Sequence, residues 1–219
     1  MTGDAQYGSA SRTPLRPEAV PAGTNVLIAG PGLTGKREVL LDLLGAAPDP
    51  AAMLVTTKHG VDRFREGFRD RYGDERSLQF VDCVSRQRSM AVARDTAAVS
   101  HVSGPGDLTG IGILASGQLY DWYRADERVR GALGLHSLST LLMYADLRRV
   151  YQFMHVLTGR VDGADCVGAY ALDTVASDPE PAARFTQLCD AVVDTRQTDE
   201  GRELRVRGGR FGPRSWTAF

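Results

Sequence analysis

The sequence predicts an α/β fold, with a mainly parallel central sheet flanked by helices and antiparallel edge strands near the C-terminus. Two patterns support this prediction. Short continuous apolar runs, which are typical of strands buried on both faces, alternate along the chain with stretches at helical spacing. Strands that alternate with helices imply the crossover connections from which parallel sheets are built. The length of 219 residues fits one domain, and 42% hydrophobic residues suffice for a buried core.

The chain divides into three predicted segments. Residues 1–20 contain Gly, Ser, Thr and Pro without periodicity and predict a mobile N-terminal arm. Regular structure is expected to begin at Asn25, within a domain that spans residues 21–210. Residues 211–219 form a flexible tail, whose aromatic side chains can attach it to the domain or to a neighbour.

The first half of the domain alternates predicted strands and helices. Strands are expected at residues 26–29, 53–57 and 78–84, and helices at residues 36–44 and 61–72. Gly45 is expected to end the first of these helices, because glycine commonly ends helices. Residues 86–106 are expected to be mostly irregular.

The second half continues the alternation. Helices are expected at residues 108–123, 147–157 and 182–189, and strands at residues 132–140 (continuing to 143), 166–172 and 191–195. Residues 204–207 alternate apolar and basic side chains, as an antiparallel edge strand does.

A glycine-rich motif lies between the first strand and the first helix. It matches G-x-x-x-x-G-K and consists of Gly30, Pro31, Gly32, Leu33, Thr34, Gly35 and Lys36. Backbone N–H groups of such a loop and of the following helix can point at a phosphate, and Lys36 can reach the terminal phosphates. The motif therefore predicts that residues 30–37 bind ATP or ADP; a glycine turn without a ligand is the competing interpretation.

Arg37 departs from this motif. The position after the lysine normally holds Ser or Thr, whose hydroxyl ligates Mg²⁺. An arginine cannot bind the metal and puts a second cation beside the phosphates. The sequence therefore argues against a bound magnesium ion.

Over residues 20–210 the chain resembles the RecA/KaiC-like P-loop ATPases, and among them a haloarchaeal branch with degenerate motifs. The resemblance rests on the glycine loop and on three further segments, residues 108–113, 135–144 and 205–208. It implies a RecA-like P-loop domain. Residues 135–144 resemble the family's Walker B strand, in which His136 takes the place of the metal-organising aspartate and Ser137 follows.

The resemblance also implies a loss of catalytic groups. Imidazole is a poor partner for Mg²⁺, and a histidine packed at a strand end is an alternative interpretation of His136. The family's catalytic glutamate normally follows the second strand, but here Lys58 and His59 stand there and the next acid is Asp62. No catalytic or metal-binding residue is therefore predicted. The expected function is a nucleotide-binding regulatory or signalling module with weak or lost hydrolysis.

Two other functions remain open. One is an active, slow ATPase of the same family, and the other is an oligomeric scaffold or DNA-associated protein with a vestigial loop. Lys36 argues against the scaffold, whereas Arg37 and His136 argue against the active ATPase. The resemblance further implies a homo-oligomer in which Arg205 and Arg207 contact a neighbour's nucleotide; solvated edge-strand charges are the competing interpretation.

Composition argues against several other classes of protein, although it does not exclude a local basic patch that binds nucleic acid. The net charge of −1 argues against a general nucleic-acid binder. Three distant cysteines predict neither a zinc site nor disulfides, and no apolar run is long enough to span a membrane. The polar N-terminus predicts a cytoplasmic protein. The glycine motif predicts an adenine nucleotide as one partner, and a regulatory module of the resembled family would also act on an unidentified protein. Asp173 lies at the end of a predicted strand, at the carboxyl edge of the sheet, where ligands of open α/β sheets bind; a turn-forming aspartate is the competing interpretation.

Overall fold

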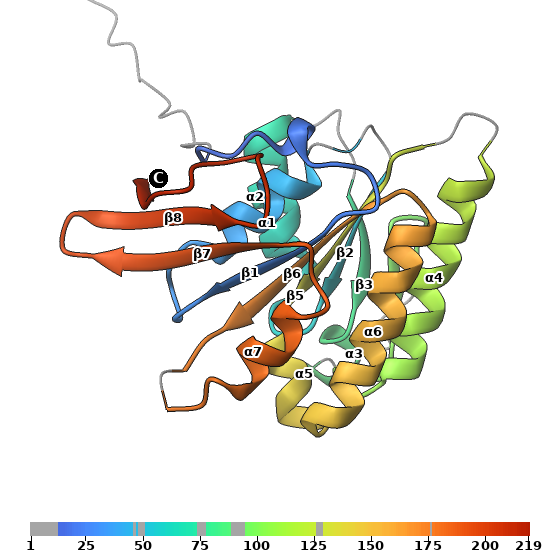
Figure 1. Ribbon diagram of the computed structural model, residues 1–219. Helices are drawn as coiled ribbons and strands as arrows, with labels where there is room; N and C mark the ends of the chain where they lie inside the picture. The colour runs from blue at the N-terminus through green and yellow to red at the C-terminus, as the bar shows by residue number, and fades with distance from the viewer. Residues whose placement is uncertain are drawn as a thin grey trace, which may run out of the picture.

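A computed structural model describes residues 13–45, 47, 51–73, 78–88, 95–125, 129–175 and 177–219. Its centre is a sheet in the order β4-β3-β2-β5-β6-β1-β7-β8-β9 (Figure 1). The parallel strands are β1 (Asn25–Gly30), β2 (Ala52–Thr56), β3 (Gln79–Asp82), β4 (Val99–His101), β5 (Ala132–His136), β6 (Val167–Asp173) and β7 (Ala191–Thr198). The antiparallel strands are β8 (Gly201–Arg207) and β9 (Thr217–Ala218). The structure confirms the predicted α/β class and the antiparallel C-terminal strands.

Helices cover both faces of the sheet. One face packs against α1 (Lys36–Leu44) and α2 (Val61–Tyr72). The other packs against α4 (Leu108–Arg124), α5 (Leu138–Tyr144), α6 (Leu147–Gly163) and α7 (Glu180–Thr186). The short η1 (Pro17–Ala19) and α3 (Ser85–Arg88) lie in connecting segments. Figure 1 shows α4 and α6 side by side on the face opposite α1 and α2.

The strand β1 shows why continuous apolar runs mark this sheet. Val26 and Ile28 belong to the core on the α1 side, whereas Leu27 and Ala29 belong to the core on the α6 side. Successive strand residues point to opposite faces, so a strand covered on both sides must be apolar throughout.

The predicted fourth strand is too long. It ends at His136, and the residues expected to continue it form α5 instead. Ser137 caps this helix by accepting the backbone N–H of Thr140, and Leu138 and Leu141 are buried one turn apart. The short apolar run in residues 138–143 fits a strand and a buried helix equally well, so periodicity alone could not separate them.

The predicted mobile arm is wrong for the part that the structure describes; residues 1–12 lie outside the described residues. Thr13 donates its backbone N–H and its hydroxyl to Asp42 of α1, at 2.9 and 2.6 Å. Leu15 and Val20 are buried in the core on the α1 side. The order of this segment could not be predicted from composition, because only Leu15 and Val20 contribute large apolar side chains to the core.

The C-terminal tail is also better ordered than predicted. Phe211 is fully buried, and its carbonyl accepts the backbone N–H of Arg16. The strand β9 pairs with β8 at Glu203 and Leu204, so β8 is not the outermost strand there. Within the segment expected to be irregular, residues 99–101 form β4, a strand too short for its periodicity to be recognised. All three cysteines are free thiols, and no described helix has the length and apolarity that crossing a bilayer requires.

Candidate functional site

The glycine loop joins the carboxyl end of β1 to the first residue of α1. Leu33 and Gly35 both adopt left-handed backbone conformations, with φ of 65° and 85°. Gly30 packs so closely on β7 that an added Cβ would lie 2.2 Å from the Thr195 hydroxyl. No side chain caps the N-terminus of α1, which leaves its first N–H groups available to an anion.

Lys36 is buried beneath this loop, with 6% of its surface exposed. Its ammonium donates to the carbonyl oxygen of Gly30 at 2.8 Å and to that of Pro31, and it lies 2.9 Å from a carboxylate oxygen of Asp173. Burial lowers the pKa of Lys36 below its ordinary value of 10.5, and the hydrogen bond with Asp173 partly opposes that shift.

Asp173 reaches Lys36 because their strands are neighbours. It ends β6 directly beside Gly30 of β1, at the carboxyl edge where the sequence places a ligand-binding position. Its backbone N–H donates to the hydroxyl of Ser139 in α5 at 2.7 Å, which fixes the strand end. About a third of the Asp173 side chain remains exposed, so a ligand can compete with it for Lys36.

His136 ends β5, one strand beyond β6, and its side chain lies in the same hollow as Lys36. Its ring meets Phe64 of α2 edge-on at 5.0 Å and lies 5.9 Å from the ring of His59. Burial, together with the nearby charges of His59 and Lys58, lowers the pKa of His136 to about 4. The imidazole is therefore neutral at pH 7, and its buried Nδ1 has no hydrogen-bond partner. Ser137, in contrast, faces α5 as its cap rather than the hollow.

The hollow encloses about 240 Å³ around the glycine loop. Its lining includes two histidines, two acids (Glu38 and Asp173) and the following basic side chains: Lys36, Arg37, Lys58, Arg63 and Arg202. Lys58 and His59 follow β2, Arg63 comes from α2 and Arg202 from β8. Three segments that are distant in sequence, residues 36–37, residues 58–63 and β8, thus place positive charge around one loop, an arrangement that attracts a polyanion.

Arg37 points to the rim of the hollow. Its guanidinium lies 3.4 Å from a carboxylate oxygen of Glu38, and Arg202 approaches the same oxygen at 3.5 Å. The sequence placed Lys36 and Arg37 at this site, but nothing in the sequence pointed to Arg63 or Arg202. These two residues are brought here by the packing of α2 and by the antiparallel return of β8, neither of which has a local sequence signal.

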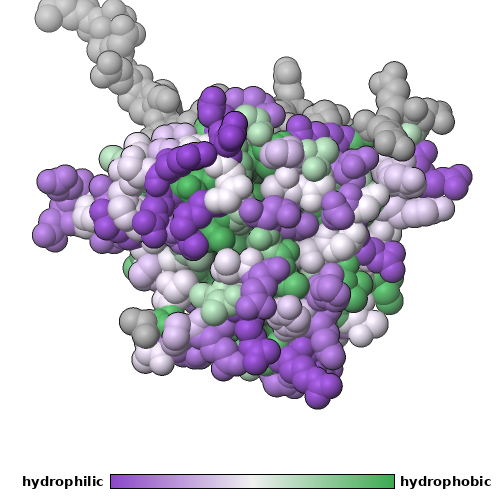
Figure 2. All heavy atoms as spheres, in the orientation of Figure 1, coloured by the Kyte–Doolittle hydropathy of each residue, from purple (hydrophilic) through white to green (hydrophobic). Residues whose placement is uncertain are grey.

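Arg205 and Arg207 occupy a different place. Both donate to Asp194 of β7, at 2.9 and 2.7 Å, and the Arg205 guanidinium lies 4.6 Å from the centre of the Trp216 ring. The predicted placement of both side chains on one face of the strand is correct. Neither of them, however, is among the described residues that line the hollow around Lys36. The β8 residue that does line it is Arg202. Figure 2 shows hydrophilic surface over the β7–β8 hairpin.

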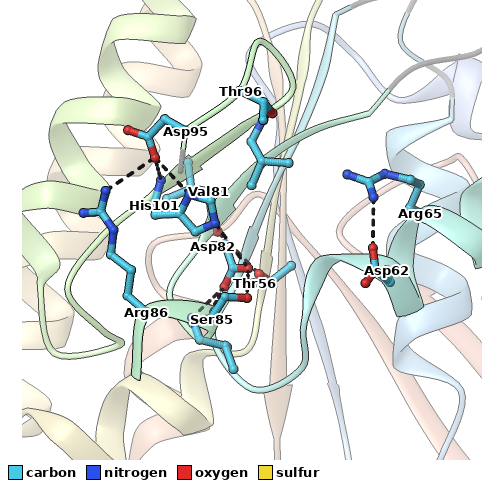
Figure 3. Close-up of polar contacts among 12 residues, drawn as sticks. Thr56, Asp62, Arg65, Val81, Asp82, Ser85, Arg86, Asp95, Thr96 and His101 are labelled. Atoms are coloured by element: carbon cyan, nitrogen blue, oxygen red, sulfur yellow. Dashed lines mark hydrogen bonds and ion pairs between the residues drawn. The ribbon is translucent and has the colours of Figure 1, made fainter. Parts of the chain in front are cut away.

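A separate polar cluster closes the far edge of the sheet (Figure 3). Asp82, at the end of β3, accepts the hydroxyl of Ser85 at 2.5 Å and two backbone N–H groups. His101 of β4 lies 2.9 Å from Asp95 and 4.0 Å from Asp82. These contacts hold the short β4 and the start of α3 to the sheet. Across the described ranges, no three His, Cys, Asp or Glu side chains are grouped as a metal site requires.

The model of a family of unknown function, DUF7504, matches residues 23–195, and the chain belongs to this family. The match covers the parallel strands from β1 to most of β7, together with the glycine loop, His136 and Asp173. Arg202, Arg205 and Arg207 lie beyond the matched residues. No curated protein matches the chain.

Proposed function

We propose that this protein is a RecA/KaiC-like regulatory or signalling module that binds ATP or ADP and has weak or no hydrolytic activity. The observation behind this proposal is the position of Lys36, buried beneath a glycine loop whose helix N-terminus is uncapped and faces a hollow rich in basic groups. Backbone N–H groups, a helix dipole and a lysine ammonium that converge on one hollow are the groups that bind phosphate.

The same hollow offers little for hydrolysis. A general base needs a carboxylate or imidazole that can accept a proton from water. In the described lining, Asp173 pairs with Lys36, and Glu38 pairs with Arg37 and Arg202. His136 is neutral, but it is largely buried and packed against Phe64. Binding without turnover therefore fits these side chains better than catalysis does.

Calorimetric titration with ATP and with ADP tests the proposal. We expect the wild type to bind both nucleotides and Lys36→Met to lose measurable binding, because methionine keeps the apolar stem but removes the charge. Arg184→Ala on α7 is the matched control, since this arginine is exposed and pairs with Glu180 away from the loop. Circular dichroism verifies that each variant is folded.

A wild type that gains no thermal stability from either nucleotide would overturn the proposal and favour a scaffold with a vestigial loop. Phosphate release above the rate of the Lys36→Met variant would favour a slow ATPase instead.

A further inference from the structure

We propose that the hollow takes a polyphosphate chain without its divalent metal ion, and that protein cations supply the positive charge that Mg²⁺ supplies in ATPases. The inference rests on the proposed function and specifies its ligand. Two observations support it: the oxygen atoms of the hollow are already paired, and the residues opposite the glycine loop are basic.

The oxygen atoms in the hollow do not fit a magnesium ion. Mg²⁺ requires oxygen ligands in near-octahedral geometry. The Asp173 carboxylate is held by Lys36, and the Glu38 carboxylate lies between two guanidinium groups. At the position where a hydroxyl would ligate the metal, Arg37 carries a positive charge instead.

The one hydroxyl of the loop is also engaged. Thr34 donates to the carbonyl oxygen of Pro31 at 2.8 Å, and its oxygen lies 2.7 Å from that of Thr195 on β7. The end of β5, which lies next to β6 in the sheet, presents the imidazole of His136, and neutral imidazole does not compete with oxygen for Mg²⁺.

The segment opposite the loop is basic. Lys58 follows β2 and Arg63 lies on the first turns of α2, and both side chains line the hollow. Lys36, Lys58 and His136 line the same hollow. Burial is the main cause of the lowered pKa values of Lys36 and His136, and the charge of Lys58 adds a smaller lowering to both. Like charges held this close repel one another, and a bound anion relieves that repulsion.

The net positive charge of the lining favours the metal-free form of the ligand over its magnesium complex. Five basic side chains face two acidic ones in this lining. Free ATP carries more negative charge than its magnesium complex, because the metal neutralises two charges. The free form should therefore bind about tenfold more tightly, as expected for two charges at the separations and effective dielectric of a half-exposed site.

Calorimetric titration of the full chain with ATP tests this inference, once in EDTA and once in excess MgCl₂ at matched ionic strength. Inorganic triphosphate is titrated under the same two conditions. We expect both ligands to bind about tenfold more weakly with Mg²⁺ present. Equal affinity for ATP and triphosphate would assign recognition to the phosphate chain, and tighter ATP binding would assign part of it to the nucleoside; both results support a polyphosphate site.

Two arginines on α2 provide a matched pair of variants. Arg63 lines the hollow. Arg65, in contrast, pairs with Asp62 at 2.9 Å (Figure 3). The guanidinium of Arg65 also lies over the ring of Phe80. Arg63→Ala should weaken binding of metal-free triphosphate at least fivefold and reduce its salt dependence. Arg65→Ala should change neither.

The outcomes separate this inference from the proposed function. Binding of ATP that is equal or tighter with Mg²⁺ overturns the metal-free site but leaves nucleotide binding intact. Equal effects of Arg63→Ala and Arg65→Ala on triphosphate binding also overturn the metal-free site. The positive charge that binds the phosphates would then not come from the side chains that line the hollow. Absence of ATP binding under both conditions overturns the proposed function itself.

Discussion

Lys36 and Asp173 form an ion pair of 2.9 Å at the point where the glycine loop meets the neighbouring strand. The two residues are far apart in sequence, yet the parallel register places Gly30 of β1 beside Asp173 of β6. The Lys36 ammonium is thus already neutralised by the Asp173 carboxylate and hydrogen-bonded to loop carbonyls. A phosphate that enters the hollow must share this lysine with Asp173 or displace it.

The first prediction concerns this competition. Asp173→Asn should strengthen triphosphate binding by up to about fivefold, because partly exposed ion pairs contribute about 1 kcal/mol or less. Calorimetry measures the effect, with Glu180→Gln on α7 as a control acid outside the hollow. Weaker binding in Asp173→Asn would show instead that the carboxylate positions the lysine for its ligand.

The second prediction concerns the metal. The double variant Arg37→Thr with His136→Asp restores both groups that P-loop ATPases use to organise Mg²⁺. The ratio of ATP affinities with and without Mg²⁺ should rise more in the double variant than the two single variants together predict. Strictly additive effects would mean that the two positions do not share a metal.

The third prediction concerns pH. The pKa of His136 is about 6.5 in the unfolded chain and about 4 in the folded chain, where burial disfavours the charged imidazole. The free energy of unfolding should therefore fall as the pH decreases from 6.5 to 4, with His136 contributing roughly 3 kcal/mol of that loss.

Urea denaturation of wild type and His136→Asn at several pH values measures this contribution. The variant should lose less stability than the wild type over the same interval. His155→Asn, a change on the exposed face of α6, should retain the wild-type slope. Parallel curves for wild type and His136→Asn would contradict the assigned pKa.

The fourth prediction concerns assembly. If Arg205 and Arg207 contact a neighbouring subunit, ATP should promote self-association, and replacing both with alanine should weaken it at least tenfold. Both guanidinium groups contact Asp194, whose side chain is only about a sixth exposed, so circular dichroism must first verify that the double variant is folded. Sedimentation at several concentrations, with and without ATP, gives the result. A protein that stays monomeric under all conditions would contradict the predicted contact with a neighbouring subunit. Arg205 and Arg207 would then be solvated surface charges.

The sequence could predict the parts of the site that depend on local pattern. A buried strand, a glycine loop and a helix follow one another between Asn25 and Leu44, and each has its own signature. The end of β6 likewise identified Asp173 as a residue of the ligand-binding edge. The sequence could not predict its pairing with Lys36, because that contact depends on the order of strands in the sheet.

The features that the sequence could not predict are those that depend on tertiary packing. Arg63 has no feature that separates it from other charged residues of an amphipathic helix, and the packing of α2, whose Phe64 meets His136 of β5, brings it to the loop. The helix α5 was mistaken for a strand because an apolar run of that length fits both. Thr13 and Leu15 gave no periodic signal, although the buried Asp42 and the core on the α1 side hold them in place.

The last residue of the chain bears on how this protein should be handled. Phe219 donates its backbone N–H to Arg202, and an added Cβ at Gly35 would lie 2.6 Å from the Phe219 ring. An affinity tag or fluorescent fusion joined after Phe219 would therefore begin beside Gly35 of the glycine loop and obstruct access to the loop. If the loop binds nucleotide as proposed, a group attached after Phe219 should weaken that binding.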